Sequence, residues 1–188
     1  MKSSPFRSSI MAAMLLSVSL GAGAAYAAHH NPMVGGAAMY PTKNIVENAV
    51  NSKDHTTLVA AVKAAGLVDT LMSAGPFTVF APTNAAFAKL PAGTVETLVQ
   101  PENKGTLTAI LTYHVVAGRI TSSSIATAIK AGRGKANLTT VQGGTLTARM
   151  VGKKLVLTDA KGGMSTVTIA DVMQSNGVIH VIDSVLLP

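Results

Sequence analysis

The last third of the chain alternates short β-type runs with glycine-containing turns, whereas the residues before it repeat apolar side chains at helical spacing. Gly143-Gly144, Gly152 and Gly162-Gly163 separate runs rich in Val, Leu and Thr, at the spacing of hairpins. A helical pattern in the first part of the domain followed by a strand pattern in the last part predicts an α+β domain. The expected strands are 77–80, 137–141, 145–151, 154–158, 166–172 and 178–182, and the expected helices are 45–50, 56–65, 67–71, 84–90, 95–99, 104–113 and 122–130.

The first thirty residues have the features of a secretory signal peptide. Lys2 and Arg7 precede an apolar stretch, 10–25, which ends in a small-x-small site at 25–27. A membrane anchor is the alternative, but the stretch contains Ser and Gly and is shorter than the roughly 20 apolar residues that a span needs. We therefore expect residues 1–27 to be cleaved after Ala27 on export, to a secreted or periplasmic location.

The rest of the chain predicts a short lead and one domain. Residues 28–43 lack apolar periodicity and contain a Gly35-Gly36 pair, so we expect a flexible lead. Residues 44–188 show no internal repeat and form the domain. A domain of this length can bury roughly two thirds of its unfolded surface, so it folds without disulfides, and the chain has no Cys.

Basic residues outnumber acidic ones, 15 to 8, and the formal net charge is +7. They are scattered along the sequence, without the clustered charge and groove-reading elements typical of nucleic-acid-binding proteins, so nucleic acid is not an expected partner. A modest positive charge is consistent with ordinary solubility and with contact to anionic glycans or lipid headgroups. Both interpretations stay open at this point.

Four sequence blocks resemble the fasciclin domain family. They occur in the family's order: HTTLVAAVKAAGLVDTL at 55–71, GPFTVFAPTNAAFAKLP at 75–91, LTYHVVAGRI at 111–120 and SNGVIHVIDSVLLP at 175–188. The resemblance implies an α+β wedge or sandwich of β-strands with several helices packed beside it. It also implies adhesion or matrix contact by non-catalytic binding, to a cell-surface or matrix protein or glycan, with no cofactor.

Family resemblance and local polarity together select four candidate binding residues: Asn84, Tyr113, His114 and Arg119. We expect the contacts to come from exposed residues around Asn84, His114 and Arg119, although Tyr113-His114 is also consistent with a buried, hydrogen-bonded pair of side chains. His114 has two interpretations, because the Tyr-His block of the family is linked both to domain integrity and to receptor contact. His180 lies within an apolar strand, which predicts a buried imidazole that is hydrogen-bonded.

Catalytic motifs are missing from the sequence. It contains no G-x-S-x-G elbow, no Cys nucleophile, no H-E-x-x-H and no dinucleotide fingerprint. Asp183 follows His180 by three residues, and residues three apart on a strand point to opposite faces. We therefore expect a binding protein and not an enzyme.

A periplasmic small-ligand or copper-binding protein is the alternative. Cleavage at the expected site would expose Ala28, His29 and His30, whose amine, two amides and third-position imidazole can hold Cu(II) in a square plane. Met33 and Met39 are candidate soft ligands nearby. Cleavage one residue later would remove this geometry, because His30 would then stand second.

Overall fold

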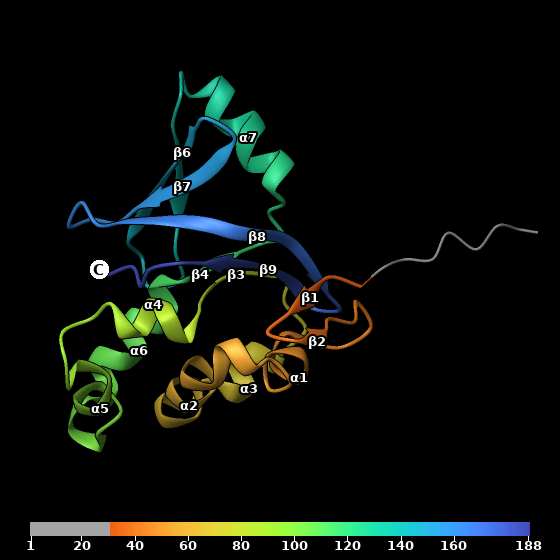
Figure 1. Ribbon diagram of the computed structural model, residues 1–188. Coiled ribbons are helices and arrows are strands. Elements are labelled where there is room, and N and C mark those ends of the chain that lie inside the picture. The colour runs from red at the N-terminus through yellow and green to blue at the C-terminus, as the bar shows by residue number, and fades with distance from the viewer. Residues whose placement is uncertain (1–30) are drawn as a thin grey trace, which may run out of the picture. The chain divides into compact units, whose positions relative to one another are not determined.

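A seven-stranded mixed sheet is the centre of the computed structural model, which describes residues 31–188 (Figure 1). The strand order is β4-β3-β9-β8-β7-β6-β5. β3 pairs in parallel with β9, whereas the other neighbouring strands pair antiparallel. The strands are β3 (Phe77–Pro82), β4 (Val115–Ala117), β5 (Ala136–Thr139), β6 (Thr145–Val151), β7 (Lys154–Thr158), β8 (Met164–Gln174) and β9 (Gly177–Ile182).

β8 curves the sheet almost into a barrel. Its register against β9 shifts between Val167 and Ile169 and again between Ile169 and Val172, and such irregularities bend a strand. An isolated bridge between Val116 and Thr140 joins the β4 end of the sheet to the segment after β5. β8 is longer at both ends than its sequence pattern predicts, because its first residues pair with β7 and the others with β9.

Two hydrophobic cores lie on opposite faces of the central strands. In β3, Val79 and Ala81 belong to the core beneath the helices, whereas Phe80 belongs to the core inside the curved sheet. In β9, Ile179 and Ile182 divide between these two cores in the same way. Successive side chains of a strand point to opposite faces, so a strand that is apolar throughout can serve two cores at once.

The helices confirm the predicted α+β class, and most of them lie on one side of β3 and β9 (Figure 1). α7 lies elsewhere and packs against β5 and β6. No helix in residues 31–188 is long and apolar enough to cross a membrane. The helices are α1 (Ile45–Ala49), α2 (Thr56–Ala65), α3 (Val68–Met72), α4 (Asn84–Ala88), α5 (Thr94–Leu98), α6 (Lys104–Tyr113) and α7 (Ser122–Ala131), with 3₁₀ turns η1 (Lys53–His55) and η2 (Pro101–Asn103).

Local sequence explains where several helices begin and end. Thr83 caps α4, because its hydroxyl accepts a hydrogen bond from the Ala86 amide at 3.2 Å. Gly66 ends α2 in the left-handed conformation, with a φ of 73°. Asn103, which precedes α6, makes no capping hydrogen bond and donates instead to the Thr97 carbonyl at 2.9 Å.

The segment before α1 differs from the flexible lead that we expected up to residue 43. Its residues form a two-stranded hairpin, β1 (Met33–Val34) and β2 (Ala37–Ala38). Val34 and Met39 are only 4% and 2% exposed and belong to the core beneath the helices. The sequence pattern missed this hairpin because two short strands and one buried methionine produce no periodicity. The compact unit therefore begins at Asn31.

Candidate functional site

Tyr113 and His114 lie in the interior, at 0% and 2% exposed, so their side chains do not form an exposed binding surface. The Tyr113 hydroxyl donates to the Thr145 carbonyl at 2.9 Å and accepts from the Ala160 amide at 3.1 Å. Nε2 of His114 accepts from the Leu186 amide at 3.0 Å, so Nδ1 carries the proton and donates to the Ile110 carbonyl at 2.8 Å. Both side chains instead hold the end of α6 to the strands and to the C-terminal segment.

The environment of His114 keeps its imidazole neutral. Burial lowers its pKa to about 4, although the Ile110 carbonyl and the charge of Asp159 act in the opposite direction. Of the two interpretations of the Tyr-His block, these contacts support domain integrity.

Asn84 and Arg119 are nearer the surface, and each holds a different part of the fold. The Asn84 side chain accepts from the Thr57 amide at 3.0 Å and donates to the Lys53 carbonyl at 2.8 Å, which ties α4 to the start of α2. The exposed Arg119 donates to the Gln174 and Ser175 carbonyls, both at 3.1 Å. The four sequence-predicted residues therefore attach to separate elements and are not brought together in one site.

His180 confirms the prediction of a buried, hydrogen-bonded imidazole. Its Nδ1 accepts from the Asp171 amide at 3.2 Å, and its Nε2 donates to the Ile120 carbonyl at 2.9 Å. Burial lowers its pKa, opposed by the Ile120 carbonyl and Asp171. Because both ring nitrogens are bonded to backbone, His180 cannot activate a hydroxyl, even though Ser122 and Asp171 bond to each other nearby.

His55 was not singled out from the sequence as a functional candidate, and it differs from the other two buried histidines. Its Nδ1 lies 2.9 Å from the Ser52 hydroxyl, but no described group lies in hydrogen-bonding geometry with its Nε2. Burial lowers the pKa of His55, opposed by the Ala81 carbonyl and the charge of Asp54. The Ala81 carbonyl lines the same pocket and acts on the ring, but it does not meet the geometry of a hydrogen bond with Nε2. His55 becomes a functional candidate only because its Nε2 is buried without a partner in the described structure, and neither burial nor pairing can be read from the sequence.

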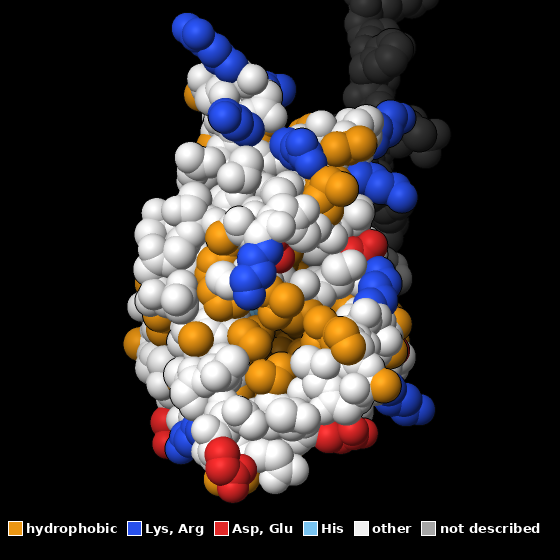
Figure 2. Space-filling model, turned by 90° about the vertical axis from the view of Figure 1, so that its left-hand side faces the viewer, with side chains coloured by type: hydrophobic (Ala, Val, Ile, Leu, Met, Phe, Trp, Pro, Cys, Tyr) orange, Lys and Arg blue, Asp and Glu red, His pale blue; other side chains and the backbone are white. Residues whose placement is uncertain are grey.

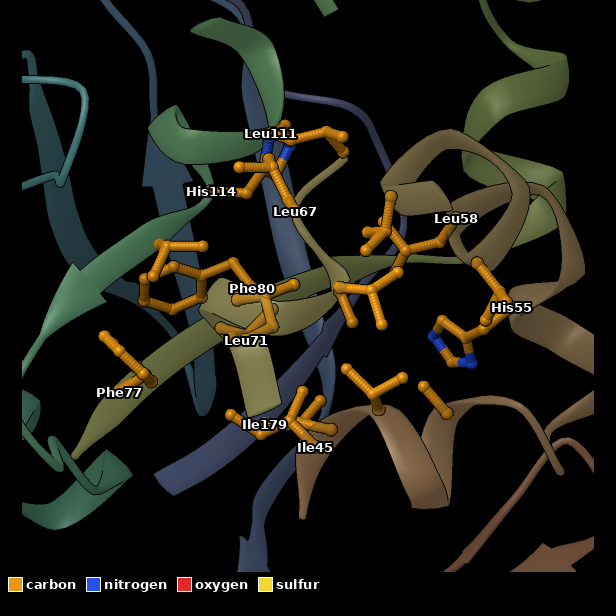
Figure 3. A pocket seen from close by; sticks show the side chains of 18 of the residues that line it. Ile45, His55, Leu58, Leu67, Leu71, Phe77, Phe80, Leu111, His114 and Ile179 are labelled. Atoms are coloured by element: carbon orange, nitrogen blue, oxygen red, sulfur yellow. The ribbon is translucent and has the colours of Figure 1, made fainter. Parts of the chain in front are cut away.

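His55 lines an apolar pocket of about 80 Å³ beneath the helices (Figure 3). Figure 3 shows its imidazole pointing inward, between Leu58 and Ile45, while Phe77 lies across the pocket. α1, α2, α3, β3 and β9 and the end of α6 supply the lining. The pocket wall is made mainly of aliphatic side chains, among them Ile45, Leu58, Val62, Leu71, Val79 and Ile179.

A second feature is a basic end, formed by the last turn of α7, the loop that follows it and the β6–β7 hairpin. α7 packs on β5 and β6, and Figure 2 shows basic side chains gathered at this end. No Asp or Glu occurs between Glu102 and Asp159, and the hairpin exposes Met150 and Val151, by 41% and 56%. We call six exposed residues the basic end: Lys130, Arg133, Lys135, Arg149, Lys153 and Lys154.

The candidate copper ligands Ala28, His29 and His30 lie outside the described residues, so that site stays a prediction. Met39 is buried in the core and is not available as a ligand, whereas Met33 is 58% exposed. Within residues 31–188, no group of three His, Cys, Asp or Glu side chains is placed to hold a metal ion.

A nearly closed mixed sheet with helices beneath its central strands defines a compact α+β domain with one apolar pocket among its helices. The fasciclin domain model matches residues 53–188, and this chain belongs to the fasciclin domain family. A solved structure agrees: a fasciclin domain pair from the insect cell adhesion molecule fasciclin I superposes with a TM-score of 0.67. It is 21% identical, and the match covers 78% of this chain and 51% of that one.

Three curated relatives are bacterial proteins. Protein sll1483 of Synechocystis sp. is 49% identical over 156 residues, which span 83% of this chain and 79% of that protein. The immunogenic protein MPB70 of Mycobacterium bovis is 41% identical, over 74% of this chain and 66% of its own length. The cell surface glycolipoprotein MPB83 of the same species is 35% identical, over 90% of this chain and 72% of its own length.

Proposed function

We propose that this chain is an exported fasciclin-domain protein that adheres, without catalysis, to an anionic glycan of the cell envelope or extracellular matrix. The basic end carries the proposal, because its six exposed cations all lie in one stretch of sequence, 103–158, that contains no acidic residue. The names of two relatives support a surface role: the cell surface glycolipoprotein MPB83 and the insect cell adhesion molecule fasciclin I.

The geometry of the basic end favours a polymeric anion over a small one. Its cations project from α7, from the loop that follows and from the β6–β7 hairpin, so they spread over several elements. Charges closer together than the Debye length, about 8 Å at physiological ionic strength, reinforce one another. A polyanion can contact several of them at once, and the exposed Met150 and Val151 add apolar contact area.

Export is the second part of the proposal, and it depends on the N-terminal residues. We expect residues 1–27 to be removed, so that the mature chain begins at Ala28, the same terminus that the copper hypothesis requires. Intact-mass measurement of protein recovered from the envelope or medium tests this. A product that retains Met1 in those fractions would contradict it.

Retention on immobilised alginate, with neutral dextran as the control matrix, tests the basic end directly. We expect Lys153→Glu/Lys154→Glu to weaken binding to alginate tenfold or more, since a cation near an anionic surface contributes about 1 kcal/mol. Binding should also fall steeply with added salt.

A matched variant separates local charge from net charge. Lys104→Glu/Lys161→Glu makes the same change of net charge at two exposed lysines away from the basic end, and it should retain most of the binding. Equal losses in the two double variants would show that only the overall charge matters and would refute a site at the basic end.

A further inference from the structure

The three buried histidines of the described domain provide an internal comparison. His114 and His180 each use both ring nitrogens in hydrogen bonds. His55 is equally buried, at 3% exposed, yet its Nε2 has no partner among the described residues. Buried polar groups in native proteins nearly always have a partner, so an unpaired one calls for an explanation.

The fold holds His55 in this position through a tight local structure. The Ser52 hydroxyl forms a hydrogen bond with Nδ1 of His55. The β1–β2 hairpin contacts the same 3₁₀ turn, η1, where the Lys53 amide donates to the Gly35 carbonyl at 3.2 Å. Gly35 has a φ of 57°, and a Cβ there would lie 2.4 Å from the Ser52 hydroxyl oxygen. Ser52 therefore holds the imidazole at Nδ1, and the unpaired Nε2 lies on the pocket side (Figure 3).

We propose that this pocket binds a slender, neutral, apolar molecule that ends in a hydroxyl group, and that His55 Nε2 forms a hydrogen bond with that hydroxyl. The proposal does not depend on the basic end. It rests on two observations, the aliphatic pocket and the unpaired nitrogen of a fully enclosed histidine.

The chemistry of His55 selects the head group. The contact with Ser52 is compatible with either neutral tautomer, so Nε2 either donates or accepts. A hydroxyl can both donate and accept and so fits both tautomers. A carboxylate does not fit, because burial lowers the pKa of His55 and leaves no positive charge to compensate a buried anion.

The size and lining of the pocket select the rest of the ligand. A dry apolar cavity of about 150 Å³ admits benzene in another protein, and this pocket is about half that size at 80 Å³. The pocket can therefore enclose only part of a ligand of that size, which suits a slender chain that enters by one end better than a compact ring. The lining also includes Lys63, Thr70 and Val141, which are exposed, so a chain longer than the pocket can extend toward the surface.

Binding of 1-hexanol tests the proposal, with heptane as a probe of equal heavy-atom count and hexanoate as an anionic probe. Affinity is measured by titration followed by protein NMR, with the ¹⁵N shifts of the His55 ring as a direct readout. We expect 1-hexanol to bind roughly two- to tenfold tighter than heptane, the range that one net hydrogen bond provides. Hexanoate should bind more weakly than 1-hexanol, and only the alcohol should shift His55 Nε2.

Three substitutions test the location of the site. Val59→Phe places bulk in the pocket lining and should abolish binding, whereas Val151→Phe makes the same change at an exposed hairpin position and should not. His55→Leu should remove the preference for 1-hexanol over heptane while heptane still binds. The His55 ring shift in the wild-type protein needs no variant, so it remains decisive if a variant does not fold.

Several outcomes would overturn the proposal. These are an unchanged His55 ring during the 1-hexanol titration, equal affinity for 1-hexanol and heptane, and full binding by Val59→Phe. The Lys153→Glu/Lys154→Glu variant should bind 1-hexanol normally, so failure of the pocket and failure of the basic end are distinguishable.

Discussion

Single polar side chains hold the irregular junctions of this domain together. The Asn176 side chain accepts from the Ile45 amide at 3.1 Å and donates to the Leu71 and Ser73 carbonyls at 2.7 and 2.9 Å. One residue at the β8–β9 turn therefore secures the start of α1 and the end of α3. The sequence marks Asn176 only as a turn former, because its partners are more than a hundred residues away.

His114 makes the stability of the domain dependent on pH. Its pKa is about 4 when folded and near 6.5 when unfolded, so between these values the unfolded chain binds the extra proton. Stability therefore rises with pH across this window and is lost as pH falls from 6.5 to 4. The shift corresponds to about 3 kcal/mol, and burial lowers the pKa of His55 and His180 in the same direction.

Urea unfolding at several pH values between 4 and 7 measures this dependence. His114→Gln has no group that titrates in this window at position 114, so its stability should change less steeply with pH by up to about 1.4 kcal/mol per unit. The slope is the informative quantity, since the substitution also lowers stability at every pH. A slope equal to that of the wild-type protein would show that His114 is not the titrating group.

At the scale of secondary-structure elements, the β1–β2 hairpin is part of the folded domain. It brings Met39 into the core beneath the helices, and the Lys53–Gly35 backbone bond attaches it to η1. Asn48 strengthens the attachment through two hydrogen bonds between its side-chain amide and the Tyr40 backbone. Its Oδ1 accepts from the Tyr40 amide at 3.1 Å, and its Nδ2 donates to the Tyr40 carbonyl at 2.8 Å. Losing this segment would expose one side of the pocket that contains His55.

Two methionines in this segment provide a matched pair of substitutions. Met39→Ala, at 2% exposed, should lower the free energy of unfolding by roughly 2–5 kcal/mol. Met33→Ala, at 58% exposed, should change it by no more than about 0.5 kcal/mol. Chemical denaturation of both variants measures the difference, and equal small effects would mean that the segment is loosely attached.

At the scale of the whole molecule, the two candidate binding features belong to different parts of the domain. The pocket lies among α1–α3 and the central strands, whereas the basic end lies on α7 and the β6–β7 hairpin. The bend of β8 makes this possible, since one strand pairs with β7 at its start and with β9 along the rest. Surface attachment and ligand binding can therefore be tested and altered independently.

The sequence by itself determined the family, the α+β class and the order of most helices and strands. These depend on local patterns: apolar periodicity, glycine turns and the four sequence blocks. The burial of His180 was predictable too. Apolar residues flank it on both sides in the same strand, and such a strand is typically buried on both faces.

Only the tertiary structure decided which residues are exposed and which polar atoms are paired. It placed Tyr113 and His114 inside, because the end of α6 packs against β6 and the C-terminal segment, whose bonding residues are 32 and 72 positions further along the sequence. It folded residues 33–38 of the expected lead into a hairpin and showed that His55, alone among the three buried histidines of residues 31–188, has a ring nitrogen without a hydrogen-bond partner in that part of the chain. Burial and hydrogen-bond pairing depend on contacts between distant segments, and local sequence does not encode where those segments meet.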